Sequence, residues 1–186
     1  ALLERRGERV LFVATAGFED LCTIGDQTRR NLFDLKARKF EPLTNDCLGV
    51  LESIDKDGRV IRPVDESEAE LQLTTAFESG LRSVAIAFKN SYKNSAHEIV
   101  LGNLAQRIGF REIYLSHQVS SLPGYLERAE TTILDAYLAP IANDYFKDIE
   151  RHLGIDGQLY IMASDGSLKS SNEIYPRELI LSGPAG

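Results

Sequence analysis

The chain has 186 residues, a formal net charge of -7 at pH 7 and a pI of about 5.1, and this length suggests one domain with part of a second. Hydrophobic residues make up 43% and charged residues 26%, which supports a packed core and argues against wholesale disorder. The acidic balance and the scattered Lys and Arg exclude a nucleic-acid binder, and the lack of an apolar run of about 18 residues excludes a membrane-spanning helix.

The first third of the chain predicts two strands and a hairpin. Residues 10–14 form an apolar, β-branched run of strand length, and residues 17–35 follow as a loop with a helical turn. Residues 47–55 predict a second strand. This strand turns at Asp57-Gly58 into another apolar pair, and an Asp-Gly step between two apolar runs favours a β-hairpin.

The middle of the chain predicts a βαβ unit. Residues 83–88 and 112–116 are apolar runs of strand length, and a helical pattern between them begins at Ser95 and ends at Gly109. Ser95 and Glu98 have the spacing of a capping box, so we expect both side chains to cap this helix. Two strands joined by a helix through short links should be parallel, with a right-handed crossover.

Two further helices flank this unit. Asp65 and Glu68 again have capping-box spacing, and they predict a helix that ends at Gly80. Residues 130–153 form a long helical pattern in which Pro140 removes one backbone hydrogen bond and predicts a kink. The helical pattern of this segment is a set of apolar residues at helical spacing, namely Leu134, Leu138, Ile141, Tyr145, Ile149 and Leu153.

Residues 159–163 and 178–181 predict the last strands, and each is followed by a glycine-bearing loop. Small residues in the loops 164–167 and 182–186 would let backbone amides approach an anion, although ordinary strand-ending turns are the alternative. The fold class predicted by these elements is α/β. Because the chain starts on a pattern that resembles the tail of a helix and stops on a glycine-rich loop, we expect it to be cut at both ends.

Histidine and cysteine provide few candidates for chemistry. The three histidines lack metal-ligand spacing, and His97 and His152 fall near the ends of predicted helices, where a solvated or capping role is expected. His117 follows a predicted strand, where binding residues often lie in α/β sheets. Cys22 and Cys47 form no CxxC pair, which predicts inert free thiols and a reducing, cytoplasmic setting.

Six motifs occur in the order of a known family and cover nearly the whole chain. They are ALLER at residues 1–5, GFED and IGDQ within residues 17–27, SYKNSAHE at residues 91–98, the ER, TT and DAYL groups within residues 127–138, MASDGSL at residues 162–168, and LSGPAG at residues 181–186. With these motifs the chain resembles the hydantoinase A/5-oxoprolinase family.

The resemblance implies an actin-like or sugar-kinase-like ATPase fold and the ATP-dependent opening of a cyclic amide, such as 5-oxoproline or a hydantoin. It implies ATP and Mg²⁺ as cofactors of the intact protein and a small cyclic amide as substrate. It leaves open a hydantoinase B-type subunit or domain, and further copies of the chain, as partners. It also divides the chain into an N-terminal region, residues 1–125, and the start of the hydantoinase A region, residues 126–186.

The resemblance places candidate catalytic residues at the start of the long helix. Glu127, Arg128 and Thr131 are expected near one wall of the active cleft, and the planar guanidinium of Arg128 suits a carboxylate or a phosphate. The alternative is that Arg128 pairs with Glu127 or Glu130 on the surface.

The last loop is the predicted nucleotide contact. The candidate ATP-binding residues are Ser182, Gly183, Ala185 and Gly186, whose backbone amides and hydroxyl would bind phosphate. No metal ligand is assigned, because the family's other phosphate- and metal-binding loops correspond to positions outside residues 1–186. We therefore expect the chain to be inactive by itself.

Three residues depart from the family's pattern. Gly124 stands where the family has Glu, and Asp135 and Asp165 stand where it has Asn. These departures leave the substrate open. One alternative function is a subunit of an ATP-dependent ketone carboxylase, and another, of a different class, is a non-catalytic piece that serves folding or subunit contact.

Overall fold

The computed structural model describes residues 4–25, 41–153, 159–171 and 173–180. Its centre is a parallel four-stranded sheet with the strand order β2-β1-β5-β6. The strands are β1 (Val10–Thr15), β2 (Asp46–Val50), β5 (Ser83–Ala87) and β6 (Glu112–Leu115). The predicted α/β class and the parallel βαβ unit are therefore confirmed.

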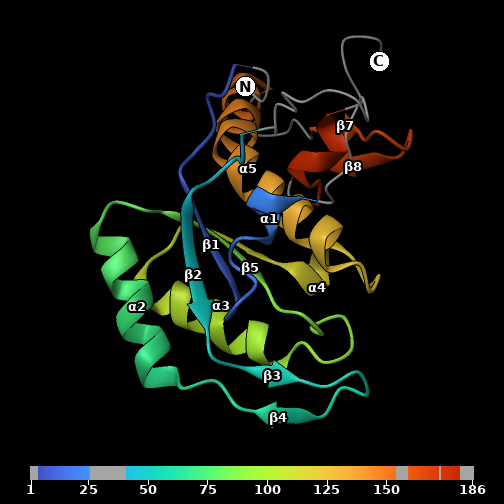
Figure 1. Cartoon of the computed structure of the whole chain (residues 1–186). Helices are drawn as coiled ribbons and strands as arrows, with labels where there is room; N and C mark the ends of the chain where they lie inside the picture. Colours follow the sequence, from blue (N-terminus) through green and yellow to red (C-terminus); the bar gives the residue numbers. More distant parts are fainter. Residues whose placement is uncertain (1–3, 26–40, 154–158, 172, 181–186) are drawn as a thin grey trace, which may run out of the picture.

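Helices cover both faces of this sheet (Figure 1). The helices on one face are α2 (Glu66–Glu78) and α3 (Ala96–Ile108), and those on the other are α5 (Tyr125–Leu153) and the short α1 (Leu21–Ile24). Leu11 and Val13 of β1 point into the first core, while Val10 and Phe12 point into the second. Because both faces are buried, β1 reads as a continuous apolar run without the alternation of a half-exposed strand.

The order in which the chain adds strands to the parallel sheet changes side between β1 and β5. The strand that follows β1 lies on one side of it, and the strand that follows β5 lies on the other side. Right-handed crossovers in opposite directions use opposite faces of a sheet, which agrees with α1 lying beside α5 and α3 lying beside α2. In α/β sheets, ligands bind outside the carboxyl ends of the strands near such a change of side.

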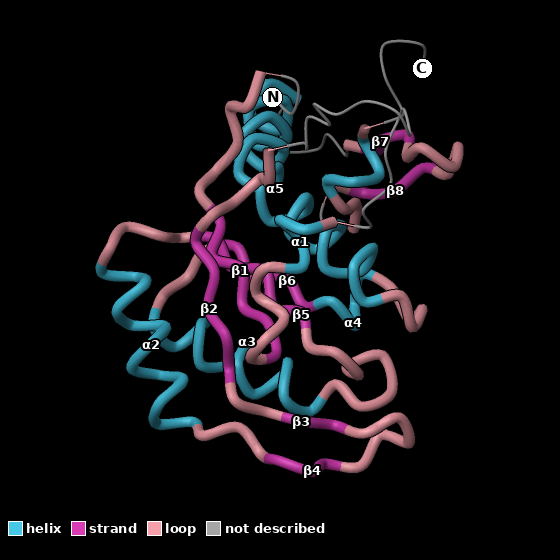
Figure 2. The backbone as a smooth tube through the Cα atoms, viewed as in Figure 1, coloured by secondary structure: helices cyan, strands magenta, loops and turns pink. Residues whose placement is uncertain are grey.

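The predicted hairpin is confirmed. β3 (Ser53–Ile54) and β4 (Val60–Arg62) pair in antiparallel fashion beyond the end of β2 (Figure 2). The turn is stabilised because the amides of Asp57 and Arg59 both donate to Asp55 Oδ1 at 2.8 Å, and Gly58 takes a φ of 85° that favours glycine. A second small pair, β7 (Tyr160–Met162) with β8 (Leu168–Ser170), contains the predicted strand 159–163.

The predicted start and end of α2 are confirmed. Asp65 Oδ1 accepts from the amides of Ser67 and Glu68, each at 3.1 Å, which satisfies two of the amides that a helix leaves open at its first turn. The residue after the last turn, Gly80, has a φ of 99°. Gly109 ends α3 in the same left-handed region, with a φ of 114°.

The apolar residues that predicted the long helix form only part of its buried face, which includes Leu138. Ile141, Tyr145 and Leu153 are 38%, 64% and 47% exposed. The residues that α5 buries against the sheet are Ala129, Ile133, Ala136 and Tyr137. This stripe contains small alanines, which let the first half of α5 approach β5 closely, and such residues add little to an apolar pattern judged on large side chains.

The helix begins at Tyr125, five positions before the predicted residue 130. Pro140 lies inside it, as expected, and has no amide proton to give to the carbonyl of Ala136. Ser83 of β5 replaces the missing donor, because its Oγ donates to Ala136 O at 2.7 Å. The backbone hydrogen bond that the helix lacks at Pro140 is thus replaced by a bond from a side chain of the sheet.

The strand predicted at residues 178–181 is wrong. Pro176–Leu179 form a 3-10 helix, in which Pro176 occupies the first position and Glu178 accepts from the amide of Tyr175 at 3.0 Å. Proline fixes φ in the helical range, so this local geometry overrides the apolar pattern. Residues 181–186 lie outside the described residues. Among the described helices, none has both the length and the apolar character needed to cross a membrane.

Candidate functional site

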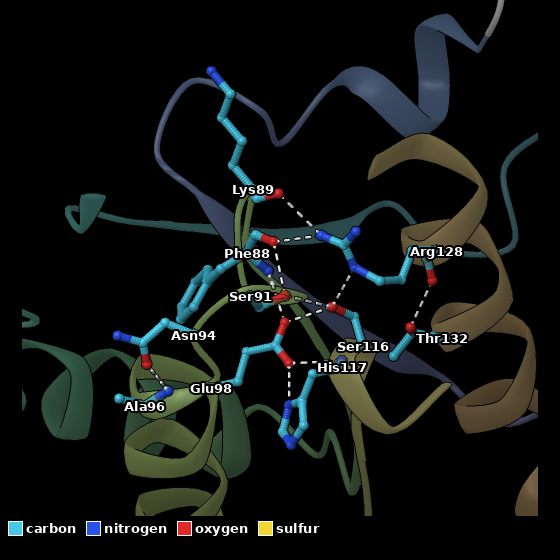
Figure 3. Close-up of polar contacts among 10 residues, drawn as sticks. All are labelled: Phe88, Lys89, Ser91, Asn94, Ala96, Glu98, Ser116, His117, Arg128 and Thr132. Atoms are coloured by element: carbon cyan, nitrogen blue, oxygen red, sulfur yellow. Dashed lines mark hydrogen bonds and ion pairs between the residues drawn. The ribbon is translucent and has the colours of Figure 1, made fainter. Parts of the chain in front are cut away.

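Buried polar side chains gather at the carboxyl ends of all four parallel strands, and Figure 3 shows those around the ends of β5 and β6. These residues come from the strand ends, from the first turn of α3 and from α5, and they are Thr15, Glu52, Ser91, His97, Glu98, Ser116 and Arg128, with the half-buried His117 beside them. We call this group the carboxyl-edge network. Such a concentration of polar groups inside a fold requires hydrogen-bond partners for each of them.

Glu98 is the centre of one half of the network and has no exposed surface. Its Oε1 accepts from the amide of Phe88 at 2.9 Å and from Ser116 Oγ at 2.5 Å. Its Oε2 lies 3.0 Å from the amide of His117 and 2.6 Å from Nδ1 of the same residue. Burial raises the pKa of Glu98, but the hydrogen bonds from His117, Ser116 and Phe88 outweigh it and lower the pKa below its ordinary value. Glu98 is therefore a carboxylate at neutral pH.

The capping box predicted for α3 is wrong. Ser95 makes no side-chain hydrogen bond to the helix, and Glu98 points into the interior instead of back to the helix start. Asn94 provides a cap, because its Oδ1 accepts from the amide of Ala96 at 3.0 Å. Three donors from two other segments favour the buried position of the carboxylate over a single exposed amide.

The other half of the network joins His97 to the ends of β2 and β1. His97 is 5% exposed, so the expected solvated role is wrong. Its Nδ1 lies 2.6 Å from Glu52 Oε2, and Thr15 Oγ1 donates to Glu52 Oε1 at 2.5 Å. Thr15 Oγ1 in turn accepts from the amide of Lys89 at 3.1 Å, which fixes the start of the loop after β5.

His97 and Glu98 are consecutive residues. His97 pairs with a glutamate and Glu98 pairs with a histidine, and each partner follows an edge strand. The acid that follows β2 binds His97, and the histidine that follows β6 binds Glu98. One dipeptide therefore links the carboxyl ends of the two outer strands across the sheet. A His-Glu pair at a helix start is the sequence signal for this arrangement, although it does not identify the partners.

Arg128 is 1% exposed and belongs to the same network. Its Nη2 donates to the carbonyls of Phe88 at 2.7 Å and Lys89 at 3.1 Å, and its Nη1 donates to Leu122 O at 3.0 Å. Its Nε donates to Ser116 Oγ at 2.9 Å, so Arg128 reaches Glu98 through this hydroxyl. The alternative of a surface ion pair with Glu127 or Glu130 is wrong. Burial lowers the pKa of Arg128, and Glu98 opposes this change.

The remaining predicted site residues are not part of the network. Glu127 is exposed, and Thr131 Oγ1 donates to the carbonyl of Glu127 at 2.6 Å within the helix. The predicted ATP-binding residues Ser182, Gly183, Ala185 and Gly186 lie outside the described residues.

Two of the residues that depart from the family's pattern have local structural partners. Asp135 is buried on α5 and forms an ion pair with Arg177, whose amide also donates to Asp135 Oδ1 at 2.8 Å. Asp165 Oδ1 accepts from the amide of Ser167 at 2.9 Å in the turn between β7 and β8. The carboxylate at position 135 therefore holds the 3-10 helix, Pro176–Leu179, against α5.

Both cysteines are free thiols. Burial raises the pKa of Cys22 to about 12, so this thiol is unreactive at neutral pH, but Cys47 is exposed. Within the part of the chain that the structure describes, no group of three or more His, Cys, Asp or Glu lies in an arrangement that could hold a metal ion.

Two family models match the chain. Residues 1–109 match the hydantoinase/oxoprolinase N-terminal region, and residues 128–186 match hydantoinase/oxoprolinase. Similar proteins include a 5-oxoprolinase of Saccharomyces cerevisiae, 37% identical over 99% of this chain, and one of Dictyostelium discoideum, 33% identical over 100% of it. The chain spans 17% of the length of each of these relatives. The acetophenone carboxylase gamma subunit of Aromatoleum aromaticum is 33% identical over 74% of this chain. The matched part is 21% of the length of that subunit.

Two solved structures share the fold. The ATP-dependent caprolactamase of Pseudomonas jessenii matches 99% of this chain and 28% of its own, with a TM-score of 0.86 and 24% identity. A nucleotide-free acetone carboxylase matches 98% of this chain and 28% of its own, with a TM-score of 0.83 and 20% identity. At these identities the likeness shows the fold alone.

Proposed function

Because the chain belongs to the hydantoinase/oxoprolinase family, we propose that it acts as part of an enzyme that uses ATP to open a cyclic amide of the 5-oxoproline or hydantoin type. The observation that carries the proposal is the 37% identity to a 5-oxoprolinase over 99% of the chain. The carboxyl-edge network supports it, because two buried carboxylate–histidine pairs at the binding edge of a parallel sheet are suited to move protons.

Within this proposal ATP supplies a phosphoryl group that activates the unreactive amide. We propose that Ser182, Gly183, Ala185 and Gly186 hold its phosphates, mainly through backbone amides. The described residues contain no set of ligands that fits Mg²⁺, so we assign none to this chain.

We propose Glu127, Arg128 and Thr131 as the catalytic residues at the start of α5. Of the five N–H donors of Arg128, four are bonded to the loop after β5, to Leu122 and to Ser116, which leaves one N–H of Nη1 without a partner among the described residues. This supports a role in which Arg128 positions the loop and directs one donor to an anionic group. Glu127 and Thr131 lie on the outer side of the same helical turns.

The proposal is tested with the purified enzyme that contains this chain. Phosphate release from ATP is measured without substrate, with 5-oxoproline and with a hydantoin, and the ring-opened product is quantified in the same samples. The expected result is ATP hydrolysis that rises with one cyclic amide and matches its opening. If neither amide changes ATP hydrolysis, the proposal is wrong. In the same assay Gly183→Val should raise the KM for ATP while the enzyme stays folded.

A second function is favoured by the carboxylase relative. The 33% identity to an acetophenone carboxylase gamma subunit supports a subunit of an ATP-dependent ketone carboxylase. An assay with labelled bicarbonate distinguishes the two reactions. A carboxylase incorporates the label into an acid in the presence of a ketone, whereas the opening of a cyclic amide does not require bicarbonate. That relative is by name a subunit, which also supports a partner of the hydantoinase B type.

A further inference from the structure

The imidazole of His117 is held at two points by one carboxylate oxygen. Glu98 Oε2 lies 2.6 Å from Nδ1 of the ring and accepts from the backbone amide of His117 at 3.0 Å. The oxygen therefore fixes both the backbone and the ring of the first turn of α4 (Ser116–Val119). A ring held in this way has one orientation, and Figure 3 shows its second nitrogen on the side away from Glu98.

The surrounding hydrogen bonds also determine where the ring proton lies. Ser116 Oγ has one proton and gives it to Glu98 Oε1, and the amides of Phe88 and His117 are donors as well. A carboxylate that is surrounded by donors carries no proton of its own, so Nδ1 must be the donor to Oε2. In the neutral ring Nε2 then keeps its lone pair.

The second nitrogen is accessible. The side chain of His117 is 19% exposed, and Nε2 has no hydrogen bond to another described residue. This exposure leaves room for a ligand or water to approach the ring. His97 has the same type of pairing with Glu52, but its side chain is only 7% exposed.

We propose that His117 is the proton acceptor of this site and that Glu98 is its positioning residue. The inference rests on the proposed function, which supplies the reaction. Nε2 takes a proton from the attacking water as the water oxygen bonds to the carbon of the amide whose oxygen carries the phosphoryl group. When the carbon–nitrogen bond breaks, the imidazolium gives this proton to the leaving nitrogen, so the histidine returns to its neutral form. The hydroxyl group left by the water loses its proton to solvent, and a second water molecule releases phosphate from the resulting acyl phosphate. The Glu98 carboxylate stabilises the imidazolium in between.

The charged and titratable groups around the pair come from two other segments. Arg128 and Tyr125 of α5 and Tyr92 of the loop after β5 interact electrostatically with Glu98 or with one another. Arg128 reaches the carboxylate only through Ser116, whereas His117 contacts it directly. The imidazolium is therefore the nearest cation to Glu98 when the ring is protonated.

The first test measures the tautomer in the 186-residue chain. With only three histidines, nitrogen-15 NMR resolves each ring, and His97→Gln and His152→Gln variants assign the signals. In the neutral ring of His117 we expect the proton on Nδ1 and a free Nε2, and we expect Glu98→Gln to abolish this preference. The exposed His152, whose Nδ1 contacts a backbone carbonyl, is the internal control for the effect of Glu98→Gln. Its ring signals should be the same in the unmodified chain and in this variant. A proton on Nε2 of His117 in the unmodified chain would overturn the inference even if Glu98→Gln does not fold.

The second test uses the complete enzyme with a cyclic amide substrate that it opens. His117→Gln should lower kcat by about 10²-fold to 10⁴-fold, change KM little and alter the pH profile of kcat/KM. His152→Gln should leave all three unchanged. An active enzyme whose His117→Gln variant keeps kcat and the pH profile contradicts the role of His117 but leaves the proposed function intact. An enzyme that opens no cyclic amide contradicts both, whereas the NMR result still decides the tautomer.

Discussion

Ser83 of β5 donates its hydroxyl proton to the carbonyl of Ala136 in α5 at 2.7 Å, and this is the carbonyl that Pro140 leaves without a helical donor. Both Ser83 and Ala136 have no exposed surface. A buried carbonyl without a donor is costly, so the serine and the proline depend on each other.

This dependence predicts a coupled pair of substitutions. Ser83→Ala should lower the free energy of unfolding by about 1–3 kcal/mol, because the carbonyl of Ala136 loses the hydroxyl donor that replaces the amide missing at Pro140. In the presence of Pro140→Ala the same change should cost less, since the new amide at position 140 can bond to that carbonyl. Denaturant unfolding of the two single variants and the double variant measures the coupling. Equal costs of Ser83→Ala in both backgrounds would show that the residues act independently.

The lowered pKa of Glu98 predicts a stability that depends on pH. A carboxyl group whose pKa is lower in the folded chain than in the unfolded chain stabilises the folded chain at pH values above its ordinary pKa. This stabilisation is lost as the pH falls through the pKa that the group has in the folded chain. Glu98→Gln should therefore lower the free energy of unfolding by about 3–5 kcal/mol at pH 7. The difference from the unmodified chain should shrink as the pH falls below 4.5, the ordinary pKa of the group. Glu70→Gln, which changes an exposed carboxylate of α2, is the control. A difference that stays constant down to acid pH would contradict the ionised state of Glu98.

The two helix starts predict stability losses of different size when a polar side chain is removed. Asp65→Ala should destabilise the chain by about 0.5–2 kcal/mol, because two amides of α2 lose their acceptor. Ser95→Ala should change the stability by less than this, because the Ser95 side chain caps nothing. Thermal unfolding of both variants is sufficient for the comparison. A larger loss of stability for Ser95→Ala than for Asp65→Ala would show that Ser95 does cap α3.

We expect the 186-residue chain to bind Mg-ATP weakly or not at all. We propose that several loops of the intact enzyme hold the nucleotide phosphates, and we assign only residues 182–186 of this chain to that task. Titration calorimetry measures the affinity directly. A micromolar Kd would show that this chain alone contains a complete nucleotide site.

Hydrophobic patterning was a sound guide to the sheet, because strands buried on both faces, such as residues 83–87, consist almost wholly of apolar residues. It was a poor guide to α5, where the buried stripe is marked by Ala129 and Ala136. The carboxyl-edge network could not be predicted from spacing. Glu98 and His117 are 19 positions apart and Glu52 and His97 are 45 apart, so their meeting depends on the strand order. At Ser95 the local capping pattern was misleading, because Glu98 has stronger partners in the tertiary structure.

The adjacency of His97 and Glu98 has a mechanical consequence for the sheet. Consecutive residues of an α-helix point about 100° apart, which lets these two side chains reach the ends of β2 and β6 on opposite sides of α3. The two outer strands thus share one peptide unit as their common anchor. A ligand that displaces the end of one edge strand would therefore act on the same peptide unit that holds the other.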